Sequence, residues 1–165
     1  RVCLDRPEAR VMICGDFRSV FDDIPLPADQ KIYQPWVPQT DWARALAWFD
    51  IGLAPLHGEK DERFSWKKVL EFMVMKIPWV ASEGGPYHDL RSYGWLVSNN
   101  ANAWERVLLD MIDHLKDYKA EAARDAYLYG LSQNMDENLD RLLSAYDSIS
   151  RQASLSELSC SPSSA

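Results

Sequence analysis

The chain has 165 residues, of which 47% are hydrophobic, and its 18 Lys and Arg against 25 Asp and Glu leave a formal net charge of −7. This composition predicts one folded domain of ordinary size and excludes a wholly disordered chain. The acidic balance, with no block of Lys and Arg, argues against a nucleic-acid partner, because phosphate binding depends on clustered basic side chains.

No apolar stretch is long enough to span a membrane, and residues 1–7 lack the apolar run of a signal peptide. We therefore expect a cytoplasmic protein without a transmembrane segment. The three cysteines lie far apart, so a disulfide framework is not indicated.

Short apolar runs alternate with segments of helical periodicity along most of the chain. Each run is stopped by Gly, Pro or Asn, which is typical of strands that are buried on both faces of a parallel sheet. The predicted strands are residues 11–14, 31–34, 51–54, 79–82 and 95–97.

Helices are predicted in the gaps and after the last strand. Asp41 would cap a helix through Trp48, and Ser65 would cap a second helix that stops before Pro78. A third helix, over residues 103–116, follows the last strand.

The alternation of strands and helices predicts an α/β fold, a Rossmann-like parallel sheet with flanking helices, followed by helices over roughly 119–130 and 134–149. The domain would occupy residues 1–149, and the Ser-rich residues 150–165 would form a disordered tail. Residues 1–9 are typical of the last turn of a helix that enters the strand at 11. We therefore expect a sheet that lacks the strand and glycine-rich turn with which a doubly wound fold opens.

Ligands of open parallel sheets bind beyond the carboxyl ends of the strands, so the turns that follow the predicted strands should line one cleft. There Trp36 and Val37 would offer an aromatic face and backbone groups to a nucleobase, although Trp36 as core filling is the alternative. Gly84 and Gly85 would let the backbone approach a phosphate or sugar, and Pro86 would start a helix.

Seven tryptophans all fall within residues 36–104. Trp36 and Trp66 are expected at the rim of the sheet. The others singled out, which are expected to pack in the core, are Trp42, Trp48, Trp79 and Trp104.

A series of segments between residues 50 and 90 keeps an ordered spacing: Asp-Ile-Gly-Leu-Ala-Pro-Leu at 50–56, Lys-Val-Leu-Glu-Phe-Met at 68–73, Ile-Pro-Trp-Val-Ala-Ser at 77–82 and Gly-Pro-Tyr at 85–87. With its surroundings over residues 8–146, this series resembles the carboxyl-terminal, donor-binding half of family 4 (group 1) glycosyltransferases of the GT-B type. The resemblance implies a retaining enzyme that transfers a sugar, a hexose, from a nucleotide-sugar donor to an unknown acceptor. It also implies a missing amino-terminal GT-B domain that binds the acceptor, so we expect the present chain by itself to transfer little.

The resemblance also assigns site residues. A family Glu at the position of Glu71 hydrogen-bonds the donor ribose, and a carboxylate can accept from two adjacent hydroxyls; a solvated helix Glu is the alternative. Arg63 stands where the family has a second Glu, eight positions earlier. Arg63, Lys67 and Lys68, beside a helix start at Ser65, can hold a diphosphate, and we expect Arg63 and Lys68 to be catalytic; ordinary basic surface residues are the alternative.

Two departures from the family pattern keep another function open. Arg63 replaces a Glu and Lys76 replaces a usual Gly, and both favour a non-catalytic, degenerate glycosyltransferase-like binding module, whereas Glu71 and the intact rim favour an enzyme. No Asp-x-Asp pair occurs, so no metal and no other cofactor is expected. The histidines show no metal-ligand spacing either: His57, His88 and His114.

Overall fold

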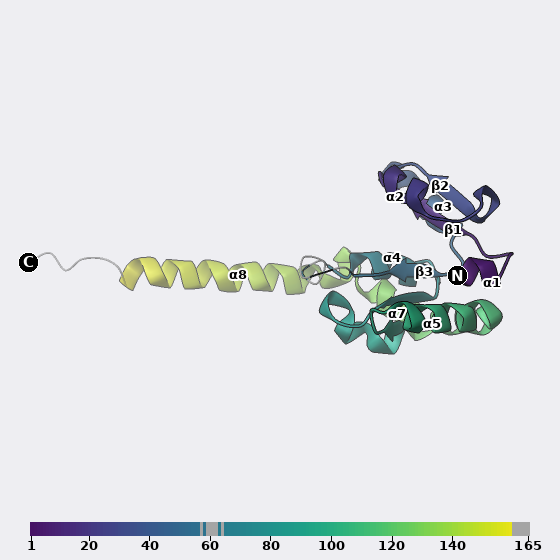
Figure 1. Cartoon of the computed structure of the whole chain (residues 1–165). Helices are drawn as coiled ribbons and strands as arrows, with labels where there is room; N and C mark the ends of the chain where they lie inside the picture. Colours follow the sequence, from purple (N-terminus) through teal and green to yellow (C-terminus); the bar gives the residue numbers. More distant parts are fainter. Residues whose placement is uncertain (57, 59–62, 64, 160–165) are drawn as a thin grey trace, which may run out of the picture. The chain divides into compact units, whose positions relative to one another are not determined.

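The computed structural model describes residues 1–56, 58, 63 and 65–159, and the chain divides into two compact units, Arg1–Gly130 and Leu131–Ala165 (Figure 1). The first unit contains all the strands that the structure describes and the predicted site residues. The second unit consists mainly of one long helix.

The five described strands lie where the sequence predicts them, to within one residue. They are β1 (Val11–Cys14), β2 (Lys31–Gln34), β3 (Gly52–Ala54), β4 (Trp79–Ser82) and β5 (Trp95–Val97). All of their pairings are parallel. Together with the helices between the strands, this confirms the α/β fold class.

The strands divide between two sheets, where the sequence predicts one. β1 pairs with β2, and β3, β4 and β5 form a separate sheet in that order. In the doubly wound order 3-2-1-4-5-6 these groups correspond to 3-2 and 4-5-6, so the break falls at the place of strand 1. In that order, a strand at this place hydrogen-bonds to the strands that correspond to β1 and β3. The expectation of a domain that lacks its first strand stays a prediction.

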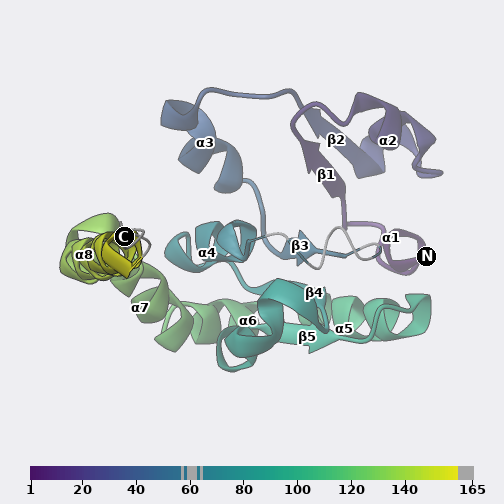
Figure 2. The ribbon, with the colours of Figure 1, turned by 90° about the vertical axis from the view of Figure 1, so that its left-hand side faces the viewer.

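The helices alternate with the strands, and α5 lies beside β5 (Figure 2). The helical elements of the first unit, the last of which reaches into the second unit, are α1 (Val2–Asp5), α2 (Arg18–Asp23), η1 (Ala28–Gln30), α3 (Gln39–Leu46), α4 (Lys67–Val74), η3 (Gly85–Tyr93), α5 (Ala101–Asp113), α6 (Leu115–Ala122) and α7 (Asp125–Ser132). The predicted helix over 119–130 is therefore broken between α6 and α7.

Two predicted helix caps are corrected by the structure. Asp41 lies inside the first turn of α3, which starts after Pro38, and Trp66 precedes the first residue of α4 in place of Ser65. Neither helix start has a side-chain cap. The extended backbone of Pro38 (φ −55°, ψ 152°) and the packing of the Trp66 ring against the core set where these helices begin.

The core of the first unit lies around β4, the middle strand of its sheet, which is buried at every position and therefore on both faces. Trp79 is fully buried, as predicted, and a Cβ atom on Gly94 would lie 2.2 Å from its ring. Trp42 and Trp66 are partly buried against this core. Trp48 corrects the prediction, since 72% of it is exposed and Phe49 takes the core position instead.

The second unit contains α8 (Met135–Ser159), which continues through residues 150–159 where the sequence predicts a disordered tail. A helix that already exists extends at little cost, because the unfavourable step is the first turn. Residues 160–165 of the predicted tail lie outside the described residues. In the described part of the chain, no helix combines the length and the apolar character that crossing a membrane requires.

Candidate functional site

The carboxyl ends of β3, β4 and β5 are joined by a buried polar network. The hydroxyl of Ser82, which is 1% exposed, accepts the Leu56 N–H at 2.9 Å and donates to Oδ1 of Asn99 at 3.2 Å. Nδ2 of Asn99 donates to the Leu56 carbonyl at 2.7 Å. These polar groups therefore satisfy one another's hydrogen-bonding needs, and they link the carboxyl ends of the three strands at the rim of the sheet. The sequence signal that was missed is a Ser and an Asn directly at strand ends.

The turn after β4 needs glycine for its backbone conformation. Gly84 has a φ of 119° and Gly85 a φ of 51°, both in the region that side chains disfavour. A Cβ atom on Gly84 would meet no heavy atom within 4 Å, so one side of this turn is open. Pro86 stands in the first turn of η3, as predicted. The turn can thus present its backbone to a ligand.

Glu71 is oriented by a neighbouring helix, unlike an ordinary solvated helix Glu. Its side chain is 26% exposed, and its Oε2 accepts a hydrogen bond of 2.9 Å from Nε1 of Trp42 on α3. Nζ of Lys67 lies 3.9 Å from its other oxygen, Oε1. Glu71 is thus a half-buried carboxylate with a defined direction.

The basic residues predicted to hold a diphosphate are exposed. Lys67 and Lys68 form the start of α4, one turn before Glu71, and Ser65 lies just ahead of them. Arg63 is exposed as well. Two lysines in the first turn of a helix oppose the helix dipole, which favours anions there. The arrangement therefore places positive charge beside the amino end of α4.

Trp36 and Val37 follow β2, in the other sheet. Trp36 is 66% exposed and Val37 is half-buried, so the core-filling alternative for Trp36 is wrong. Trp66, in contrast, packs against the core, with its ring centroid 6.3 Å from that of Tyr129. Of the two rim tryptophans, only Trp36 offers an open aromatic face.

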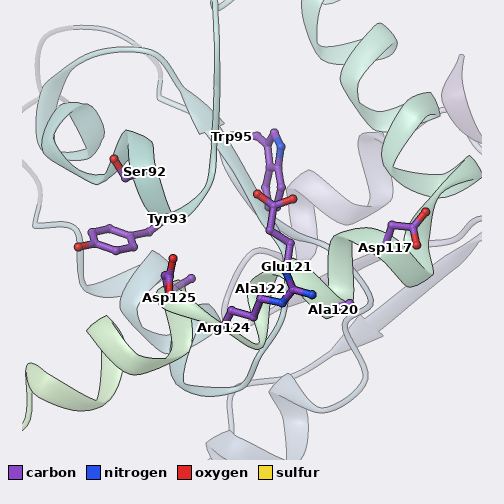
Figure 3. A pocket seen from close by; sticks show the side chains of 10 residues that line it. Ser92, Tyr93, Trp95, Asp117, Ala120, Glu121, Ala122, Arg124 and Asp125 are labelled. Carbon is purple, nitrogen blue, oxygen red and sulfur yellow. The ribbon is translucent and has the colours of Figure 1, made fainter.

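A cavity of about 470 Å³ lies elsewhere, at the amino end of β5 (Figure 3). Trp95 and charged side chains of α6 and α7 line it, among them Glu121 and Arg124. None of the predicted site residues does so. Ligands of parallel sheets bind at the opposite, carboxyl end of the strands, so this cavity does not mark the predicted cleft.

The described part of the chain also contains His, Asp and Glu side chains and a cysteine at a strand end. No group of three or more His, Cys, Asp or Glu there could hold a metal ion; His57 lies outside the described residues. Burial raises the pKa of the Cys14 thiol at the end of β1, which keeps this sulfur in its protonated, weakly nucleophilic form.

Comparisons with known proteins bear on the fold. No protein-family model matches the chain. No curated protein matches it either. Among solved structures, HepE from Anabaena, determined in complex with UDP, is similar with a TM-score of 0.62 and 16% sequence identity. The match covers 87% of this chain and 44% of HepE, so the chain spans less than half the length of that protein. At this identity the likeness shows a shared fold: the chain has the α/β architecture of a protein that has been solved with a nucleotide.

Proposed function

We propose that the chain is the donor-binding part of a glycosyltransferase that uses a nucleotide sugar. The observation that carries the proposal is Glu71, a half-buried carboxylate held in a fixed direction beside the lysines of α4. The sequence resemblance to family 4 enzymes and the structural likeness to a UDP-bound protein both support it. Retention of configuration, a hexose as the sugar, and an acceptor site on a separate amino-terminal domain belong to the same proposal.

In this proposal, different residues of the site bind different parts of the nucleotide-sugar donor. Glu71 accepts hydrogen bonds from the two ribose hydroxyls, because a carboxylate offers several lone pairs to adjacent donors. Lys68 and Arg63, with the N–H groups at the start of α4, bind the diphosphate and stabilise the charge that develops on the leaving group. Ser65 lies beside them.

The base and the sugar of the donor contact the turns that follow β2 and β4. Trp36 stacks on the base, and Val37 offers its backbone. The backbone of Gly84, Gly85 and Pro86 approaches the sugar or the phosphate next to it. The proposal includes no metal ion.

Isothermal titration with UDP, GDP and uridine tests the donor site. We expect saturable binding of a nucleoside diphosphate, and a Glu71→Ala variant that binds both UDP and uridine about 10- to 100-fold more weakly, the loss of one or two hydrogen bonds to a charged group. Glu137→Ala, an exposed Glu of α8, is the matched control and should bind as the wild type does. Absence of saturable binding to any of these ligands, or equal affinities for wild type and Glu71→Ala, would disprove the site.

The phosphate contact has its own test. Lys68→Ala should weaken the binding of UDP about tenfold and leave the binding of uridine unchanged, because only UDP carries the charged groups that an ammonium binds. Lys116→Ala, an exposed lysine of α6, is the control. If Lys68→Ala weakens uridine as much as UDP, Lys68 does not bind phosphate.

A degenerate, non-catalytic binding module remains a second candidate because Arg63 replaces the second family Glu. Turnover of a UDP-sugar by the chain together with the rest of the enzyme, measured as released UDP, separates the two. Donor binding without turnover, even with the rest of the enzyme present, would favour the binding module.

A further inference from the structure

The indole of Trp42 makes the direct contact that orients the candidate donor-binding carboxylate. Trp42 lies in α3 and Glu71 in α4, 29 positions apart in sequence, and Nε1 of Trp42 donates to Oε2 of Glu71 at 2.9 Å. The distance is that of a good hydrogen bond to an ionised acceptor. Nothing in the spacing of the two residues along the chain predicts this pair.

Trp42 is well suited to hold another side chain still. Its ring is partly buried and packs against the hydrophobic core cluster of the unit, to which Phe72 and Leu46 belong. An indole has two rotatable side-chain bonds, whereas Glu loses much more rotamer freedom when it is ordered. The core thus holds the indole N–H of Trp42 in place, and this N–H orients the Glu71 carboxylate.

The contact leaves Glu71 able to bind a ligand. An ionised carboxylate has about four acceptor positions, and the indole N–H occupies one of them. Because the indole is neutral, it orients the carboxylate without cancelling its charge. Lys67, the charged neighbour, is 71% exposed and its ammonium stands 3.9 Å away, which makes a weak ion pair. Acceptor positions on Glu71 therefore remain for two hydroxyls.

We infer that Trp42 is a positioning residue of the donor site, which sets the Glu71 carboxylate toward the ribose hydroxyls before the nucleotide arrives. The inference rests on the proposed function, since it concerns the same site. A carboxylate that is already ordered loses less entropy on binding, so part of the affinity for ribose depends on Trp42. Trp42 itself does not touch the donor.

A double-mutant cycle tests this role. UDP and its 2′-deoxyribose analogue are titrated into the wild type, Trp42→Phe, Glu71→Ala and the double variant. Trp42→Phe keeps an aromatic ring in the core and removes the N–H. We expect Trp42→Phe to weaken the binding of UDP about 5- to 10-fold and to reduce the preference for UDP over the deoxy analogue. In the Glu71→Ala background, Trp42→Phe should cause no further loss of affinity.

Trp48→Phe is the matched control, because Trp48 follows α3 and is 72% exposed. It should leave both affinities unchanged. A Trp42 that only supports packing would lower the thermal midpoint in Trp42→Phe while the ratio of the two affinities stayed the same, and this result would overturn the inference. If the wild type binds no UDP, or binds it independently of Glu71, the proposed function itself fails.

A second measurement does not depend on the folding of Trp42→Phe. With Trp42 kept, the NMR resonance of its indole N–H should differ between the wild type and Glu71→Ala. In the wild type, hydrogen exchange of this N–H should slow when UDP binds. The 2′,3′-dideoxy analogue of UDP, which lacks both ribose hydroxyls and keeps the diphosphate, should not slow the exchange when it is added at a saturating concentration. An indole resonance that is the same with and without Glu71 would show that the hydrogen bond does not form in solution, and would overturn the inference.

Discussion

Lys76 shows how a residue other than glycine can hold a left-handed backbone conformation at the end of a helix. Among the described residues, it is the non-glycine residue with a positive φ, 57°. Its N–H donates to the Met73 carbonyl at 3.0 Å, and the Ile77 N–H donates to the Phe72 carbonyl at 2.9 Å. This pair of bonds is the Schellman motif that ends a helix, in which Gly is the usual residue. The Lys ammonium lies 4.3 Å from the centroid of the Tyr127 ring. Lys76 therefore has a structural explanation and no longer argues for a degenerate site.

Substitutions at Lys76 should separate backbone strain from the ring contact. Lys76→Ala keeps the strained φ and loses the cation–π contact, which is worth about 0.5–1 kcal/mol. Lys76→Gly also loses the contact but removes a left-handed strain of about 1–2 kcal/mol. We expect Lys76→Gly to be more stable than Lys76→Ala by about 1 kcal/mol in urea unfolding, once the greater unfolded-state entropy of Gly is subtracted. Equal stabilities would mean that Lys76 does not adopt this conformation.

At the scale of elements, a two-point ion pair ties α1 to α5. Nε of Arg6 donates to Oδ1 of Asp113 at 2.7 Å, and Nη2 donates to Oδ2 at 2.6 Å. The hydrogen bond from Arg6 lowers the pKa of Asp113 from its ordinary value of 3.8, with the charge of Arg6 adding to it. The same contact raises the pKa of Arg6. Both side chains are partly exposed, so the contribution to stability is small.

The sign of the Asp113 shift predicts a pH dependence. Because the folded pKa is the lower one, the stabilisation is complete above 3.8 and is lost as the pH falls through the folded value. Asp113→Asn should thus have a lower thermal midpoint than the wild type at neutral pH, and the difference should shrink toward zero as the pH falls below 3.8. Asp22→Asn, which breaks a local pair with Arg18 within α2, is the control. A difference that persists in acid would contradict the assignment.

At the scale of the whole molecule, the division into two sheets leaves β3 at an edge. Leu53 in β3 is 41% exposed, whereas Val80, its partner in the parallel register on β4, is fully buried. In β3, Gly52 and Ala54 are buried and only Leu53 is exposed, whereas β4 is buried at every position, so one face of the sheet is uncovered at β3. A large part of the apolar side chain of Leu53 therefore remains exposed to solvent.

Truncation of these two side chains should have unequal costs. Val80→Ala removes two buried methyl groups and leaves a cavity, so we expect a loss of about 2 kcal/mol. Leu53→Ala removes more atoms but less buried area, and should cost about 1 kcal/mol or less. Urea unfolding of both variants at the same pH measures the difference. A Leu53→Ala variant that loses more than Val80→Ala would show that Leu53 is covered in solution.

The parts of the fold that could be predicted are those with a local signal. Residues 79–82 are a continuous apolar run between Pro78 and a Gly-Gly turn, and they form β4 as expected. Helix starts were predicted less well, because Asp41 and Ser65 are suitable caps in sequence while the packing of Trp66 and the conformation of Pro38 set the first turn. Where a position depends on a contact with a distant segment, the local pattern cannot contain the answer.

The sequence by itself determined the kind of residue at the candidate site: a Glu inside an apolar helix, lysines at the start of that helix, and glycines after a strand. Only the tertiary structure decided which partners these residues have. The Glu71 carboxylate meets an indole from another helix, Ser82 joins Leu56 and Asn99 across three strand ends, and Trp36 stays exposed. The physical reason is that strand and helix formation depend on short-range periodicity, whereas hydrogen-bond partners and burial depend on how elements far apart in the chain pack together.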